Sequence, residues 1–157
     1  TVVKYHTSGR LKVAPEHTEE HVLRLMRKPS FEMFERMNSR FNTICRREGL
    51  KYQLIPYFIS SHPGCEERDM RALADKVLGK LHFNLEQVQD LTPTPMTLSS
   101  VMFYMGENPY DGKEIYVARS QDDKRRQKSY FFANKPTHAT TPQPRKNGGK
   151  PHAKRRR

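Results

Sequence analysis

Apolar positions in the first ninety residues follow two periods, one typical of strands and one typical of helices. Three short apolar runs are bounded by Gly, Pro or polar residues: 11–14, 52–59 and 85–91. Between them, apolar residues recur every three or four positions in three further segments: 22–26, 31–45 and 66–81. The pattern predicts the order strand, helix, helix, strand, helix, strand.

The run Leu54–Ile59 is bulky and lacks strict alternation, so we expect a strand that is buried on both faces, as in a parallel sheet. Strands that alternate with helices indicate βαβ units with right-handed crossovers, and the predicted fold class is α/β. Ser60–Gly64 is then a strand-to-helix corner at the carboxyl end of a strand. Open α/β sheets and barrels bind ligands at such corners.

Proline, glycine and capping residues predict the element boundaries. Pro15 is expected to stop the first strand, and Thr18 is expected to cap the first helix. Ser30 is placed to cap a longer helix, which Gly49 would end. Later in the chain we expect a helix or strand, a short strand and a helix, in that order: 99–105, 114–118 and 122–132.

Charge is unevenly distributed along the 157 residues. The net charge is +12, and residues 134–157 hold eight Lys and Arg without an acid, which leaves 12 − 8 = +4 for the rest. Pro, Gly, Thr, Lys and Arg dominate this tail, so we expect it to be disordered. The predicted domains are a set of βα units, a short helical extension and a basic tail: 1–118, 119–133 and 134–157.

The basic tail offers one hypothesis for function. Its charges could bind RNA or DNA through phosphates, with a steep dependence on salt. Few aromatic residues lie among them, however, and no recognition module accompanies them. The alternative is a solubilising or nonspecific extension.

Two cysteines, Cys45 and Cys65, fit a reduced cytoplasmic setting. The chain has no hydrophobic leader and no apolar run long enough to span a bilayer, so no membrane partner is expected. Because it begins at Thr1, and because three parallel strands would leave open edges, we expect missing strands upstream.

Three segments resemble the later half of the catalytic barrel in the YgiQ family of radical S-adenosylmethionine (SAM) proteins. They occur in order and at matching spacing: LKVAPEHTEEHVLRLMRKPSFEMFERM (11–37), YQLIPYFISSHPGC (52–65) and LEQVQDLTPTPMTLSSVMFYMGENP (85–109). Methylthiotransferases are similar but more distant, and they carry Gly-Phe-Pro-Gly at the corner 61–64.

The resemblance implies a β/α barrel in which a CxxxCxxC motif holds a four-iron four-sulfur cluster that cleaves SAM to a 5′-deoxyadenosyl radical. This chain has no third cysteine. We therefore expect a carboxyl-terminal fragment that is inactive alone, binds no metal, and has the missing amino-terminal half as its partner. The substrate and the catalytic residues are unknown at this point.

The resemblance also assigns residues to the SAM site. Glu16 and His17, after the first strand, would lie near the ribose or the methionyl part. The remaining positions belong to the corner: Ile59, Ser60, Ser61, His62 and Gly64. Backbone groups of the first two would contact adenine, the others would shape the loop, and the glycine would permit close approach of its backbone.

Several of these residues have plainer alternatives. His62 is either a proton donor or substrate contact, or a loop histidine that caps the next helix or faces water. Glu16 is either a ligand contact or the acidic start of a helix. His17 and His21 have a metal-compatible spacing but lack a third ligand. Cys65 is either a thiolate activated by a helix start or an inert small residue.

Overall fold

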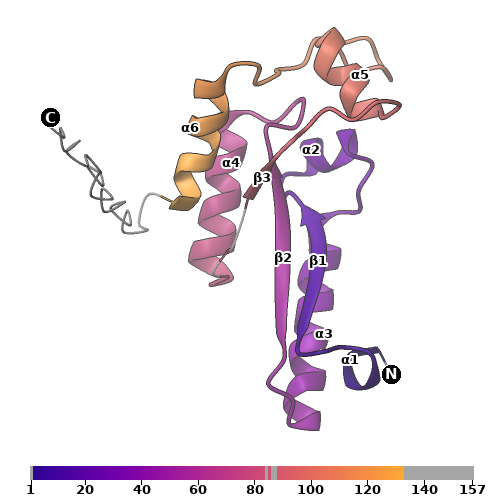
Figure 1. The fold of residues 1–157 in the computed structure, drawn as a ribbon, viewed down its shortest axis with the longest axis vertical. Coiled ribbons are helices and arrows are strands. Elements are labelled where there is room, and N and C mark those ends of the chain that lie inside the picture. Colours follow the sequence, from indigo (N-terminus) through magenta and orange to yellow (C-terminus); the bar gives the residue numbers. More distant parts are fainter. Residues whose placement is uncertain (1, 84, 86–87, 133–157) are drawn as a thin grey trace, which may run out of the picture.

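The computed structural model describes residues 2–83, 85 and 88–132, which form a mixed α/β fold. Its three strands are β1 (Arg10–Glu16), β2 (Gln53–Ser60) and β3 (Val88–Asp90). They form a parallel sheet in the order β1-β2-β3. The carboxyl ends of the strands point to the same end of the molecule, near α2 and α5 (Figure 1). The predicted parallel α/β sheet is confirmed.

Helices follow the strands in the predicted order. α4 continues without a break into a π-helix, η1, so the two together match the predicted helix. The bounds are α1 (Val2–Tyr5), α2 (Glu20–Leu25), α3 (Phe31–Glu48), α4 (Glu67–Ala74), η1 (Asp75–Lys80), α5 (Leu98–Met105) and α6 (Gln121–Phe132). Ser30 and Gly49 delimit α3 as predicted, and Gly49 has a left-handed φ of 66°.

Two predicted boundaries and one predicted strand were wrong. Pro15 does not stop β1, which continues to Glu16 with a register shift after Val13, and a residue without an N–H is tolerated at such an irregularity. Thr18 does not cap α2, because its hydroxyl donates to the carboxylate of Glu19, the actual N-cap. Residues 114–118 form no strand; Glu114 makes only an isolated antiparallel bridge to Glu107.

The two faces of β2 differ, so the prediction of burial on both faces was also wrong. Leu54, Pro56 and Phe58 are buried, whereas Ile55, Tyr57 and Ile59 are only half-buried. The half-buried side chains alternate with the buried ones and lie on the opposite face, because successive strand residues point to opposite sides. We call this face, with Ile55, Tyr57 and Ile59, the open face of the sheet.

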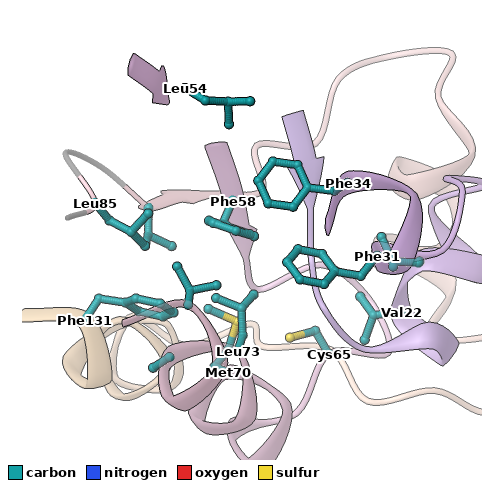
Figure 2. Packing of buried hydrophobic residues seen from close by; sticks show 14 of the residues in the cluster. Val22, Phe31, Phe34, Leu54, Phe58, Cys65, Met70, Leu73, Leu85 and Phe131 are labelled. Carbon is teal, nitrogen blue, oxygen red and sulfur yellow. The ribbon is translucent and has the colours of Figure 1, made fainter. Parts of the chain in front are cut away.

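The core lies against the buried face of the sheet, where α3, α4 and α6 contribute side chains (Figure 2). Phe58 has no exposed surface, and its ring lies 6.4 Å from that of Phe31 in α3. Met70 and Leu73 from α4 and Phe131 from α6 complete the layer. The helix α6 therefore shares the core of the sheet.

The predicted basic tail, 134–157, lies outside the described residues, so its disorder and its nucleic-acid binding stay predictions. Among the helices that are described, none combines the length and the apolar character needed to cross a bilayer.

Candidate functional site

The corner after β2 is a buried polar loop with a strained backbone. Ser60 and Ser61 have no exposed surface, and His62 is 2% exposed. Ser61 has a φ of +61°, which non-glycine residues seldom adopt, and its hydroxyl has no hydrogen-bond partner within the described part of the chain. Strain and an unpaired buried hydroxyl are typical of functional loops.

Gly64 is required by packing within this chain. Its φ is +82°, and a Cβ there would lie 2.2 Å from Cδ1 of Leu25. Its N–H donates to the carbonyl oxygen of Tyr116 at 2.7 Å. The close approach that the glycine permits is thus an approach of Leu25, and its contact with a cofactor stays a prediction.

His62 is held by two hydrogen bonds that define its tautomer. Nδ1–H donates to the Pro63 carbonyl oxygen at 2.8 Å, so Nε2 accepts from the Ser99 hydroxyl, also at 2.8 Å. Burial lowers its pKa, which keeps the ring neutral. His62 neither caps α4, whose N-cap is Glu66, nor faces water. Its partner Ser99 is half-buried and lies between the ring and the protein surface; the sequence reasoning missed this residue.

His17 and Cys65 form a buried neutral pair. The N–H of Glu19 donates to Nδ1 of His17, so Nε2–H faces the Cys65 sulfur at 3.4 Å. Burial lowers the pKa of His17 to about 4 and raises the pKa of the Cys65 thiol. The sulfur is therefore a thiol, as expected of an inert buried cysteine and not of an activated nucleophile.

The buried state of His17 predicts a pH-dependent stability. In the unfolded chain, His17 binds a proton once the pH falls below about 6.5. In the folded chain, the same residue binds a proton only near pH 4. The free energy of unfolding should fall by up to about 3 kcal/mol as the pH falls through this window. Urea unfolding at pH 7.5 and 4.5 measures the change.

Two variants identify the source of that pH dependence. His17→Gln should reduce it, whereas His6→Gln, which changes an exposed histidine, should leave it intact. Equal pH dependence in wild type and His17→Gln would contradict the assignment.

Glu16 and Ile59 lie at the accessible side of the site. Glu16 pairs with Phe58 in the sheet register, which brings it beside Ile59 at the carboxyl ends of β1 and β2. Its carboxylate lies 3.2 Å from Lys28 Nζ and is partly exposed, and its φ is +68°. The backbones of Glu16 and Ile59 thus lie near each other at one strand edge, whereas the side chains of His17, Ser60, Ser61 and His62 are buried behind that edge.

Sequence reasoning also missed Gln127 of α6. The side chain is 1% exposed, and it bonds to the backbone of Ser61 and of Cys65. One signal was available: Gln127 lies four residues before Phe131, so both occupy one helical face, and an apolar face with a single amide indicates a buried polar contact.

The described residues contain no group of three or more His, Cys, Asp or Glu that could hold a metal ion. His21, considered above with His17, instead bonds to Asp69 at 3.1 Å. A four-iron four-sulfur cluster needs at least three thiolates, and the two cysteines of this chain are buried and free. These residues do not fit the cluster.

The fold and the site define an α/β protein with a polar corner at the carboxyl edge of a parallel sheet. A domain of unknown function (DUF3362) matches residues 86–138. A UPF0313 protein of Bacteroides thetaiotaomicron is 55% identical over 131 residues, which are 83% of this chain and 21% of that protein. UPF0313 proteins of Methanocella arvoryzae and Clostridium perfringens are 45% and 42% identical over 79% and 86% of the chain, each matched over 20% of its own length.

The chain is similar to UPF0313 proteins over most of its length, and UPF0313 is the YgiQ-type family that its three segments resemble. It spans about a fifth of the length of the relatives it matches. No solved structure matches it.

Proposed function

We propose that this chain supplies later βα units of a radical SAM β/α barrel, namely its SAM-binding and substrate-facing strands. The cluster loop and the earlier strands would belong to a longer protein, and the chain alone would be inactive. The similarity to UPF0313 proteins supports this reading, because the chain matches only about a fifth of each relative. The substrate of the whole protein is not defined by these residues.

One observation carries the proposal: Glu16 and Ile59 lie at the carboxyl ends of adjacent parallel strands, beside a buried corner. The residues present fit a nucleoside. The Glu16 carboxylate can accept from ribose hydroxyls, and the half-buried Ile59 side chain offers an apolar surface. The unpaired Ser61 hydroxyl is a further polar group at this corner.

Bound SAM would supply a 5′-deoxyadenosyl group for radical chemistry. The residues of this chain would bind and orient it: Glu16 at the sugar, the backbone of Ile59 and Ser60 at the base. His62 is neutral and bonded to Ser99, so it would act on substrate through the serine hydroxyl. His17 would stabilise the loop through its hydrogen bond from the Glu19 N–H and its contact with the Cys65 sulfur.

Calorimetric titration of the full-length protein with SAM tests the site. Glu16→Gln removes a charged acceptor, so SAM should bind at least tenfold more weakly, which corresponds to about 1.4 kcal/mol. Glu20→Gln, on the first turn of α2 and paired with Arg24, is the matched control and should change the affinity less than twofold. Equal affinities for wild type and Glu16→Gln would contradict the proposed site.

A further inference from the structure

The helix α6 lies beside α4 on the outside of the corner (Figure 1). Within α6, Gln127 contacts the corner directly. Its Oε1 accepts from the Ser61 N–H at 2.8 Å, and its Nε2 donates to the Cys65 carbonyl oxygen at 2.9 Å. One side chain thus joins the two sides of the loop, and it does so from a helix 66 residues further along the chain.

The next residue of α6 holds the neighbouring strand ends. Lys128 Nζ lies 2.6 Å from Asp90 Oδ2 at the end of β3. The other carboxylate oxygen of Asp90 accepts from the Ser60 hydroxyl at 2.7 Å, at the end of β2. The chain Lys128, Asp90, Ser60 therefore links α6 to both strand ends, and Phe131 anchors the helix in the core.

These contacts explain how the corner keeps its conformation. Ser61 holds a positive φ without being glycine, and such a backbone persists only where its surroundings fix it. The Ser61 N–H is buried, and the amide of Gln127 is its acceptor. Removing that amide would leave a buried donor unpaired next to a strained residue.

We propose that Gln127 is a positioning residue for the SAM corner, and that the region matched by DUF3362 completes this site through α6. β3, α5 and α6 all lie within that match, 86–138. The inference rests on the proposed function, because it assigns to α6 the task of holding the loop that binds SAM. It gives α6 a physical role, which is to fix the ends of β2 and β3 from outside the sheet.

Three variants of the full-length protein test the role of Gln127. Gln127→Met keeps the length of the side chain and removes both hydrogen bonds. Gln121→Met is the exposed control on the same helix, and Phe131→Leu loosens the same helix without touching the corner. Hydrogen–deuterium exchange of a peptide spanning 59–66 reports on the loop, and calorimetry reports the affinity for SAM.

In Gln127→Met, the amides of 59–66 should exchange at least tenfold faster, and SAM should bind at least tenfold more weakly. Phe131→Leu should bind SAM with an affinity within threefold of wild type, even if it loses as much thermal stability as Gln127→Met. Gln121→Met should match wild type in both measurements. Should Gln127→Met not fold, Gln127→Glu tests one half of the contact, since it keeps the acceptor for Ser61 and removes the donor to Cys65. The amides of 59–66 should then exchange faster than in wild type, by less than tenfold.

Other outcomes overturn one claim or the other. Unchanged exchange in Gln127→Met overturns the role of Gln127, whatever happens to SAM. Faster exchange in Gln127→Met with unchanged affinity for SAM overturns the link between α6 and the cofactor. The proposed function still stands in that case if Glu16→Gln binds SAM more weakly than wild type. Weakening in Phe131→Leu equal to that in Gln127→Met reduces the role to general stability. A wild-type protein that does not bind SAM overturns the proposed function and this inference with it.

Discussion

Phe58→Ala should lower the free energy of unfolding by about 3–5 kcal/mol, the usual cost of removing a fully buried aromatic side chain. Phe58 has no exposed surface, lies in the central strand of the sheet, and contacts Phe31 across the core. Truncation leaves a cavity at the place where β2 meets α3 and α4. Urea unfolding of the chain at pH 7.5 measures the loss.

The neighbouring Tyr57 supplies the control. It lies on the open face, half-buried, with Lys12 Nζ 5.5 Å from the centre of its ring. Tyr57→Ala should cost about 1 kcal/mol, because it removes one partly exposed ring and one exposed cation–π contact. Equal losses at the two positions would contradict the assignment of a buried face and an open face to β2.

Gly64→Ala should lower the free energy of unfolding by about 2–4 kcal/mol, with two causes. The left-handed backbone at φ +82° disfavours any Cβ by about 1–2 kcal/mol. The added carbon also meets Leu25 Cδ1 at 2.2 Å, so the leucine must move out of its packed position. Denaturant unfolding gives the total.

A double-mutant cycle separates the two causes. Leu25→Ala in the Gly64→Ala background should recover about 1–2 kcal/mol as coupling energy, and the backbone cost should remain. Gly79→Ala is the matched control, because a Cβ there meets nothing within 4 Å and its φ is not positive; it should be neutral or slightly stabilising. Zero coupling would show that Leu25 does not restrict Gly64.

Local sequence patterns predicted the parallel sheet and the place of the corner, because both depend on short-range periodicity. The runs near Leu54 and Val88 lie in strands, and Gly49 ends α3 in the left-handed conformation that favours glycine. The position of the corner was predicted from the end of the strand near Leu54 alone.

The remaining features depend on contacts that are distant in sequence. Ile55 and Phe58 are both apolar, and their exposure differs because the helices of this chain cover one face of β2. Gln127 bonds to Ser61, and Ser99 bonds to His62 across 37 residues. No periodicity within α6 or α5 specifies those partners. Pro15 was misjudged because its tolerance depends on the register shift between Val13 and Glu16 in the pairing of β1 with β2.

We propose that the carboxyl edge formed by Glu16, Ile59 and the corner binds SAM. Hydrogen–deuterium exchange of the full-length protein with and without SAM tests it most directly. SAM should slow exchange in peptides that cover 14–18 and 57–65, and should leave the opposite end of the sheet, at 48–53, unchanged. Protection that is confined to other parts of the protein, with 14–18 and 57–65 unaffected, would contradict the account.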